Sequence, residues 1–346
     1  MQIAESIWDA YGFNKEWIVM IPFGNGLINN TWKIQVGANQ YILQNINQQV
    51  FKDPTTIASN ISLVAAYLAK HYPNYLFIAP VKTKAGTEMV LVDNIYFRLF
   101  HFVEDSHAKT VLQTADEAYE AAKQFGRFTK FLSGFDTDLL KNTLPKFHDL
   151  SERDQQFEDA IKEGNQDRKR HCSKLIETIQ QHKHITQRYL SIVADPAFKL
   201  RVTHHDTKIS NVLFDVNDKA ICVIDLDTLM PGYFISDLGD MMRTYLCPVS
   251  EEESDFSKIT IREDFYHAII QGYCEEMELE LTLAEKDALF YAGQFMIYMQ
   301  ALRFMTDYLN NDRYYGASYP EQNLVRAGNQ MVLLERLMEI EHIKKL

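Results

Sequence analysis

The first part of the chain changes from a helical to an alternating hydrophobic pattern. Apolar residues including Ile7, Trp8 and Tyr11 share one side of a helix within residues 1–15. From residue 17 to residue 103, short apolar runs alternate with polar positions and end at tight turns, which is typical of antiparallel strands. We expect strands at Ile18–Pro22, Thr31–Val36, Tyr41–Asn45, Met89–Asp93 and Tyr96–Phe102, with one helix at Thr55–Tyr72 between them.

The rest of the chain has a mostly helical pattern. We expect helices at Ala115–Leu132, from Asp237, from Arg262 onward and at Phe295–Leu309, and one or two exposed helices within Leu150–Ile192. Two short strands, Val212–Asp215 and Ile221–Asp225, flank a turn and form a hairpin. These patterns predict an α+β fold of two lobes: a small β-rich lobe over residues 1–103 and a larger, mainly helical lobe over residues 104–346.

Composition and charge argue against several classes of partner and site. The net charge of −12 argues against nucleic acid and anionic membranes as main partners. The four cysteines are far apart and form no C-x-x-C pair, which favours free thiols in a reducing compartment over a zinc site or a disulfide framework. Neither a signal peptide nor an apolar run of about 20 residues is visible, so we expect a cytoplasmic protein.

Polar residues of one segment carry the candidate chemistry. Asp206 and Asn211 lie five positions apart in a polar loop, and the hairpin that follows returns at Asp225 and Asp227. Residues i and i+2 of a strand share a face, so both of these carboxylates can point at one ligand, or one can instead cap the following turn. Carboxylate and amide oxygens suit a hard cation such as magnesium.

Phosphoryl transfer needs a metal, a base for the acceptor hydroxyl and cationic support. The H-x-D-x4-N spacing followed by an aspartate after a hairpin resembles the catalytic loop of protein-kinase-like enzymes, and more closely that of the aminoglycoside phosphotransferase and choline kinase group. The resemblance implies a protein-kinase-like fold, ATP and Mg²⁺. It also implies that Asp206 is the base, that Asn211 and Asp225 are metal ligands, and that His204 supports the loop.

A narrower resemblance covers nearly the whole chain. The chain resembles the bacterial N-acetylhexosamine 1-kinases in six segments: Gly26–Thr31, Tyr41–Gln44, His205–Lys208, Asp227–Gly232, Ser236–Asp240 and Arg303–Leu309. That group phosphorylates the anomeric hydroxyl of N-acetylglucosamine and N-acetylgalactosamine, so the resemblance implies a small sugar substrate in contact with Asp206, Arg303 and Tyr314. From the residues alone, Arg303 and Asp307 share a helix face, where they form either a surface ion pair or the border of a pocket.

The nucleotide is expected in the first lobe. We expect the turn of Gly24 and Gly26, with Asn29 after it, to cover the phosphates with backbone N–H groups. The hinge that carries Phe100 and Phe102 is expected to contact the adenine.

The expected nucleotide site departs from the wider family. Many relatives place Lys or Arg on the third strand, paired with Glu on the next helix. Here the third strand ends in Gln44, which we assign to the nucleotide site, and the helix Thr55–Tyr72 contains no acidic residue. We expect Gln44 to form neutral hydrogen bonds with Asn60 or Asn45 in place of that ion pair. Lys208 is a candidate for the missing cation, or else a solvent-facing loop lysine.

Asp237 is expected near the start of its helix, where it caps backbone N–H groups, and the resemblance implies that it braces the catalytic loop.

Two other functions stay open from the sequence. One is a kinase of another small alcohol, such as choline, ethanolamine, homoserine or an aminoglycoside. The other is a kinase-like protein that binds nucleotide without catalysis, which the missing lysine–glutamate pair keeps under consideration.

Overall fold

The computed structural model of the protein describes residues 4–24 and 28–340. The chain divides into two compact units. The first comprises residues 1–108, 134–145 and 212–231, and the second comprises residues 109–133, 146–211 and 232–346. The first unit contains the antiparallel sheet and the second is mainly helical, which confirms the predicted α+β class.

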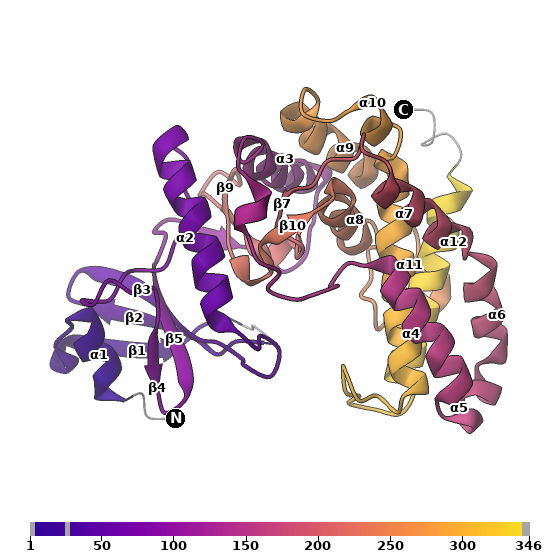
Figure 1. The fold of residues 1–346 in the computed structure, drawn as a ribbon, viewed down its shortest axis with the longest axis horizontal. Helices are drawn as coiled ribbons and strands as arrows, with labels where there is room; N and C mark the ends of the chain where they lie inside the picture. Colours follow the sequence, from indigo (N-terminus) through magenta and orange to yellow (C-terminus); the bar gives the residue numbers. More distant parts are fainter. Residues whose placement is uncertain (1–3, 25–27, 341–346) are drawn as a thin grey trace. The chain divides into compact units, whose positions relative to one another are not determined.

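The sheet of the first unit has five antiparallel strands in the order β1-β2-β3-β5-β4 (Figure 1). The strands are β1 (Ile18–Pro22), β2 (Thr31–Val36), β3 (Asn39–Asn45), β4 (Val90–Val92) and β5 (Ile95–His101). Each strand lies within two residues of its predicted range. The alternating pattern therefore identified all five.

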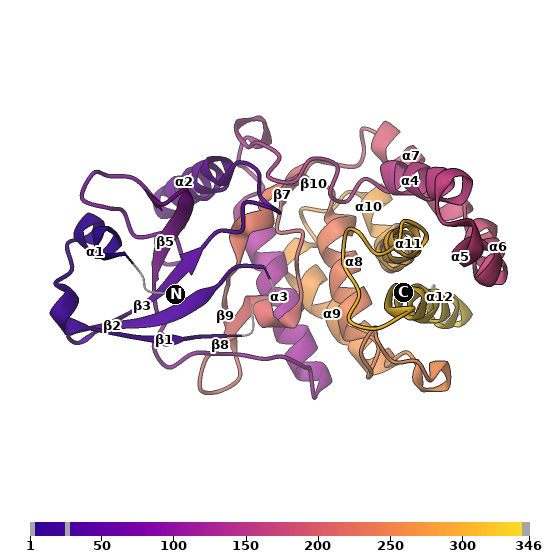
Figure 2. The same cartoon turned by 90° about the horizontal axis from the view of Figure 1, so that it is seen from below.

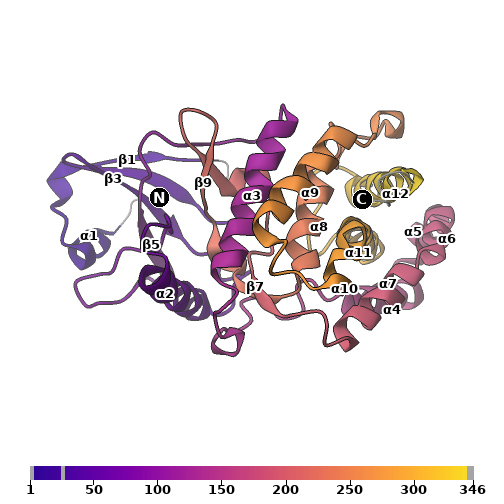
Figure 3. The same ribbon diagram turned by 90° about the horizontal axis from the view of Figure 1, so that it is seen from above.

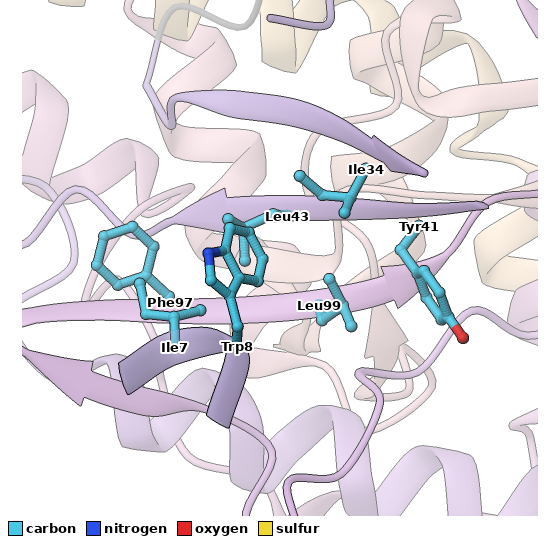
Figure 4. Packing of buried hydrophobic residues seen from close by; sticks show 7 residues of the cluster. All are labelled: Ile7, Trp8, Ile34, Tyr41, Leu43, Phe97 and Leu99. Carbon is cyan, nitrogen blue, oxygen red and sulfur yellow. The ribbon is translucent and has the colours of Figure 1, made fainter. Parts of the chain in front are cut away.

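One face of this sheet packs into a hydrophobic core. Helix α1 (Glu5–Tyr11) places Ile7 and Trp8 against Leu43, Leu99 and neighbouring apolar residues of the strands (Figure 4). Because side chains alternate along a strand, the residues next to these, including Gln44 and Arg98, point to the opposite face. The sheet thus has an apolar face under α1 and a partly polar second face.

The remaining elements of the first unit are short, apart from one helix. Helix α2 (Pro54–His71) begins after Asp53, whose side chain accepts a hydrogen bond from the backbone N–H of Thr55. The others are η1 (Lys15–Trp17), β6 (His107–Ala108), η2 (Thr137–Leu139), β8 (Val212–Phe214), β9 (Ala220–Val223), η4 (Leu226–Thr228) and β10 (Met230–Gly232). Strands β6, β8 and β9 form a second antiparallel sheet, and β8 and β9 are the predicted hairpin.

Helices build the second unit. They are α3 (Ala115–Phe131), α4 (Leu150–Glu163), α5 (Gln166–His171), α6 (Ser173–Gln181), α7 (His184–Ala194), α8 (Phe234–Tyr245), α9 (Glu263–Met277), α10 (Leu283–Lys286), α11 (Leu289–Leu309) and α12 (Gln322–Glu339). Strand β7 (Arg201–Thr203) and the short helices η3 (Ile209–Asn211) and η5 (Phe256–Lys258) complete it. Helix α11 is buried along most of its length and packs against α12, α8 and α4, with α11 and α12 side by side in Figure 2. Helices α3 and α9 also lie side by side (Figure 3).

The prediction of one or two exposed helices within Leu150–Ile192 was wrong, because this segment forms the four helices α4 to α7. Gly164 ends α4, and the Asn165 side chain accepts hydrogen bonds from the first N–H groups of α5, so a new helix begins there. Buried isoleucines, such as Ile176 and Ile179, turn one side of the later helices inward. None of the described helices has the length and apolar character that crossing a membrane requires.

Candidate active site

The loop that resembles a kinase catalytic loop joins β7 to η3 in the second unit and carries the candidate base Asp206. One carboxylate oxygen of Asp206 accepts a hydrogen bond from the Asn211 amide at 3.0 Å and forms an ion pair with the Lys208 ammonium at 2.8 Å. The Asn211 amide nitrogen also donates to the Asp206 backbone oxygen at 2.9 Å. The side chain of Asp206 is therefore held in one orientation by residues of its own loop.

These contacts set the protonation state of Asp206. Burial alone would raise its pKa, but the charge and hydrogen bond of Lys208, with smaller contributions from His204 and Asn211, hold the pKa below its ordinary value. Asp206 is therefore ionised at neutral pH. Lys208, one candidate for the missing cation of the phosphate site, pairs here with the candidate base.

Helix α8 braces the backbone of the loop. Asp237 accepts hydrogen bonds from the N–H groups of His204 at 2.9 Å and His205 at 2.7 Å, and Asp240 accepts from the N–H of Thr207 at 2.9 Å. The expectation that Asp237 caps its own helix was wrong, because α8 begins at Phe234 and Asp237 already lies inside its first turn. Burial raises the pKa of Asp237 to about 6.

His204 packs its ring edge-on to Phe125 and Phe128 of α3, so it anchors the loop to that helix. Its Nδ1 accepts a hydrogen bond from the backbone N–H of Asp206 at 3.3 Å. His204 thus links the core of the second unit to the backbone of the candidate base.

His205 occupies the left-handed region with φ of 65°, a conformation that non-glycine residues rarely adopt. Hydrogen bonds on both sides hold its ring: one joins Nδ1 and the Ser236 hydroxyl, and the other joins Nε2 and the Thr203 hydroxyl, both at 2.7 Å. The ring lies so close to Gly232 that an added β-carbon there would stand 2.5 Å from His205 Cε1. Glycine at position 232 is therefore required by this packing.

His148 and Asp149 had no role in the sequence analysis, and the structure gives each one. The side chain of Asp149 caps α4 through the N–H of Glu152. His148 bonds the Ser236 hydroxyl beside His205 and stacks on Phe147 with ring centroids 4.3 Å apart. Burial and the neighbouring His205 hold the pKa of His148 well below its ordinary value, so its ring is neutral.

The two candidate metal ligands present oxygen atoms. Asn211 uses its amide nitrogen on Asp206, which leaves the amide oxygen as its acceptor. Asp225, at the end of the hairpin in the first unit, is exposed and has φ of 62°. Among the described residues, no group of three or more His, Cys, Asp or Glu side chains is arranged to hold a metal. The amide oxygen of Asn211 and the carboxylate of Asp225 are each a type of donor that magnesium prefers.

The predicted nucleotide residues lie at both ends of the first unit's sheet: Gly24 follows β1 near the end of β3 at Gln44, whereas Phe102 follows β5 and pairs with Gln40 at the start of β3. Gly24 has φ of 73°, which suits glycine, whereas Gly26 lies outside the described residues. The Phe102 ring lies under the Lys33 ammonium at 3.6 Å from its centroid. Phe100 shares the second face of the sheet with Gln44, because Ile42 pairs with Phe100 and Gln44 lies two residues further along β3.

The expected partners of Gln44 were wrong. Gln44 donates to the Thr31 hydroxyl at 3.2 Å and accepts from Arg98 at 2.9 Å. Asn60 of α2 instead donates to the backbone oxygens of Lys141 and Leu229. The side chains of Gln44 and Asn60 therefore belong to different networks.

Arg303 and Tyr314 line one pocket of the second unit, with a volume of about 530 Å³. The Arg303 guanidinium carbon lies 5.2 Å from the ring centroid of Phe147 and 5.9 Å from that of Tyr314. No ion pair between Arg303 and Asp307 is found in the described part of the chain. Asp307 instead accepts hydrogen bonds from the N–H groups of Tyr314 and Tyr315. Asp206 is not one of the described residues that line this pocket.

The sequence profile of the phosphotransferase enzyme family matches residues 19–281, which include Asp206, Asn211 and Asp225. The chain belongs to this family. The wider family predicted from the H-x-D-x4-N spacing is thereby confirmed. Arg303 and Tyr314, the expected sugar contacts of this phosphotransferase, lie beyond the matched residues.

Solved structures agree on the fold of this phosphotransferase. It is similar to a microcompartment-associated aminopropanol kinase, with 15% identity, a TM-score of 0.70 and coverage of 97% of this chain and 96% of that one. An aminoglycoside phosphotransferase from Alicyclobacillus acidocaldarius has 14% identity, a TM-score of 0.65 and coverage of 100% and 98%. A spectinomycin phosphotransferase solved with ADP and spectinomycin has 13% identity, a TM-score of 0.62 and coverage of 97% and 97%. These matches confirm the predicted protein-kinase-like fold.

Sequence reasoning missed two groups in this phosphotransferase. The first is Asp240, which holds the loop at Thr207 and is paired in turn with Arg243. The second is Arg98, a buried arginine of β5 whose ion-pair partner is Asp227. A charge inside the otherwise apolar stretch Ile95–His101 was the available signal for Arg98.

Proposed function

We propose that the protein transfers the γ-phosphoryl group of ATP to the C1 hydroxyl of an N-acetylhexosamine such as N-acetylglucosamine or N-acetylgalactosamine. Membership of the phosphotransferase family and the whole-chain resemblance to the hexosamine kinases support this proposal. The observation that carries it is the geometry of Asp206, an ionised carboxylate fixed by Asn211 and Lys208 in a loop braced by α8.

In the proposed reaction, Asp206 accepts the proton of the acceptor hydroxyl. The acceptor oxygen forms a bond to the γ-phosphorus while the bond from that phosphorus to the bridging oxygen of ADP breaks. Because the pKa of Asp206 is lowered, its main contribution is to orient the hydroxyl, and it takes the proton late, as a loose phosphoryl-transfer transition state requires. Asn211 and Asp225 would hold Mg²⁺, and the bound ion would supply positive charge to offset that of the phosphates.

The pocket of Arg303 and Tyr314 is proposed to hold the sugar. A guanidinium beside aromatic rings offers hydrogen-bond donors for an acetamido oxygen and an apolar wall for a pyranose ring. Phe147 and His148 continue from Arg303 to Ser236 and His205, which precedes Asp206. This continuous row of contacts within the second unit supports a substrate that extends from the pocket toward the base.

A panel of acceptors tests the proposal. ATP consumption with Mg²⁺ is measured against N-acetylglucosamine, N-acetylgalactosamine, glucose, galactose, choline, ethanolamine, aminopropanol, homoserine and kanamycin. We expect turnover on the two N-acetylhexosamines. Phosphorylation at C1 removes the reducing end of the sugar, so a reducing-sugar assay distinguishes it from phosphorylation at any other hydroxyl.

The matched control is the 1-O-methyl glycoside of the preferred sugar, which lacks the C1 hydroxyl and must be inert. Turnover of that glycoside would contradict the proposed position of transfer. Turnover on an amino alcohol alone would favour a kinase of another small alcohol. Asp159 and Glu163 in the same pocket are the candidate partners of its ammonium group. Nucleotide binding without turnover of any acceptor would favour a non-catalytic protein.

A further inference from the structure

Arg98 is a buried charge that the proposed mechanism does not use. It lies in β5, where its side chain is 2% exposed. Leu99 next to it points into the hydrophobic core under α1 (Figure 4), so Arg98 points to the opposite face of the sheet. A buried guanidinium is retained only where a partner charge and hydrogen bonds compensate for its lost hydration.

Two side chains compensate for this charge, and both belong to the first unit. Gln44, the Cα partner of Arg98 across β3 and β5, accepts hydrogen bonds from Nε at 3.2 Å and from Nη2 at 2.9 Å. The Nη1 group forms an ion pair with Oδ1 of Asp227, whose side chain is 3% exposed. Arg98 is thus clamped between a strand of the sheet and the turn that follows the hairpin.

The second carboxylate oxygen of Asp227 also accepts a hydrogen bond. Asn29, just after the expected phosphate-covering turn, donates from its amide nitrogen to Oδ2 of Asp227 at 2.8 Å. The amide oxygen of Asn29 accepts from the backbone N–H of Asn47 at 3.0 Å, which fixes its orientation. Both oxygens of Asp227 therefore have partners within the protein.

Asp225 and Asp227 face different surroundings although they are two residues apart. Asp225 is exposed and adopts a left-handed backbone, whereas Asp227 is buried within η4. The left-handed residue turns the chain between the two carboxylates, so they do not share a face as they would on a regular strand. On the far side of the same turn, Asn60 donates to the backbone oxygen of Leu229 at 2.9 Å.

We propose that the Arg98–Asp227 ion pair positions the turn that carries Asp225, and that Asp227 is a positioning residue and not a metal ligand. This inference rests on the proposed function, in which Asp225 holds the metal. The pair ties η4 to the sheet from one side while Asn60 ties the residue after it from the other. Asp225 then presents its carboxylate from a backbone whose conformation is already fixed.

Binding of Mn²⁺ by the full-length protein in the presence of ADP tests the inference without turnover or an acceptor. Free Mn²⁺ is measured by electron paramagnetic resonance for the unaltered protein, for Arg98→Gln and Asp227→Asn, and for the double variant R98Q/D227N. Each single variant leaves one buried charge unpaired beside the turn, so we expect Mn²⁺ affinity to fall by about 10- to 100-fold. The double variant replaces both charges with amides that can bond to Gln44 and Asn29, so we expect it to recover most of the lost affinity.

A direct metal ligand behaves differently. If Asp227 binds the metal, the double variant stays as weak as Asp227→Asn, and that result would overturn the inference. Unchanged Mn²⁺ affinity in both single variants would overturn it as well, because the pair would then be structural only. The matched control is the pair R127Q/E276Q, which removes a partly buried arginine–glutamate pair between α3 and α9 and is expected to leave Mn²⁺ affinity unchanged.

Two further outcomes also decide whether the inference holds. If a single variant does not fold, the double variant is compared directly with the unaltered protein and with Asp225→Asn. Affinity within about threefold of the unaltered protein supports the inference, and a loss as large as that of Asp225→Asn overturns it. If the unaltered protein binds no Mn²⁺ with ADP, the proposed function itself fails, and the inference fails with it.

Discussion

Asp206 has its orientation set by residues of its own loop before any acceptor binds. Lys208 and Asn211 both contact the same carboxylate oxygen, which directs the other oxygen away from them. Replacement of Asp206 by Asn removes the proton acceptor at constant size. We expect kcat to fall by about 10²- to 10⁴-fold, with the unfolding midpoint nearly unchanged. The matched control is Asp167→Asn, an exposed aspartate paired with Arg170, which is expected to retain full activity. Activity within a few-fold of normal in Asp206→Asn would refute the assignment of the base.

If Asp206 is the base, Lys208 is expected to set the pH range in which it acts. Burial raises the pKa of Asp206 and Lys208 lowers it, so removal of the lysine leaves the effect of burial uncompensated. The base works only when it is ionised, and activity is lost as pH falls through its pKa. We therefore expect the acid limb of the kcat/KM profile to move to higher pH in Lys208→Met. An acid limb at the same pH as in the unaltered protein would show that another group controls it.

At the residue scale, spacing singled out Asp206 and Asn211, whose side chains are in contact in the structure, but it did not predict the partners of the buried charges. Asp206 and Asn211 are close in sequence, so a short motif is enough to find them. Arg98 and Asp227 are far apart in sequence and meet only because β5 and η4 belong to the same folded unit. The partners of the Gln44 side chain, the Thr31 hydroxyl and the Arg98 guanidinium, were missed for the same reason, since local sequence does not reveal which residues of neighbouring strands lie opposite one another.

Helix α8 acts as the support of the catalytic loop, and its buried Asp237 makes that support dependent on pH. Burial raises the pKa of Asp237 to about 6, whereas an unfolded aspartate titrates near pH 4. Between these values the folded protein binds more protons than the unfolded chain, so the free energy of unfolding falls as pH rises through this window. The contribution is up to about 3 kcal/mol. In Asp237→Asn this part of the pH dependence is absent. Urea unfolding at several pH values measures the free energy of unfolding of both proteins. If this free energy depended on pH in the same way in Asp237→Asn and in the unaltered protein, the prediction would be wrong.

Helices α4 and α11 and the loop after α11 line the proposed sugar pocket. Arg303 lies on the helix, and Asp307 of the same helix holds the N–H groups of Tyr314 and Tyr315. Replacement of Arg303 by Met removes the donors while keeping most of the apolar stem. We expect KM for the sugar to rise about tenfold or more, with KM for ATP unchanged. Arg336→Met, at the exposed end of α12, is the control. Equal changes in both KM values would indicate a general disturbance of the fold.

At the element scale, segments with a strong hydrophobic period were predicted well, and helices rich in charged residues were not. The five strands of the main sheet, the hairpin strands β8 and β9, and helices α2 and α3 lie within two residues of their predicted limits, whereas β6 and β10 were not predicted. The segment Leu150–Ile192 was misjudged because its charged residues hide the small apolar stripes that face inward, and because Asn165 restarts a helix after a break. Helix α8 begins before Asp237 because Phe234 and Ile235 at its start are apolar and already buried.

For the whole molecule, nucleotide and metal are expected to stabilise the fold together. A ligand that binds only the folded state, present at a hundred times its dissociation constant, adds about 2.7 kcal/mol to the free energy of unfolding. We expect ADP with Mg²⁺ to raise the unfolding midpoint, and excess EDTA to abolish most of the rise. Asp225→Asn should show the small shift of the EDTA sample even with Mg²⁺ present. An equal rise with and without metal would argue against magnesium at Asp225.

The close packing at Gly232 has a consequence for how such sequences diverge. An added β-carbon at this position would stand 2.4 Å from the Thr203 hydroxyl as well as against the His205 ring, so neither neighbour can give way without losing its hydrogen bond to the other. Positions 203, 205 and 232 are therefore expected to change as a set during evolution. A homologue with alanine at the position of Gly232 should carry a smaller residue in place of His205, and glycine is the natural choice at a left-handed backbone.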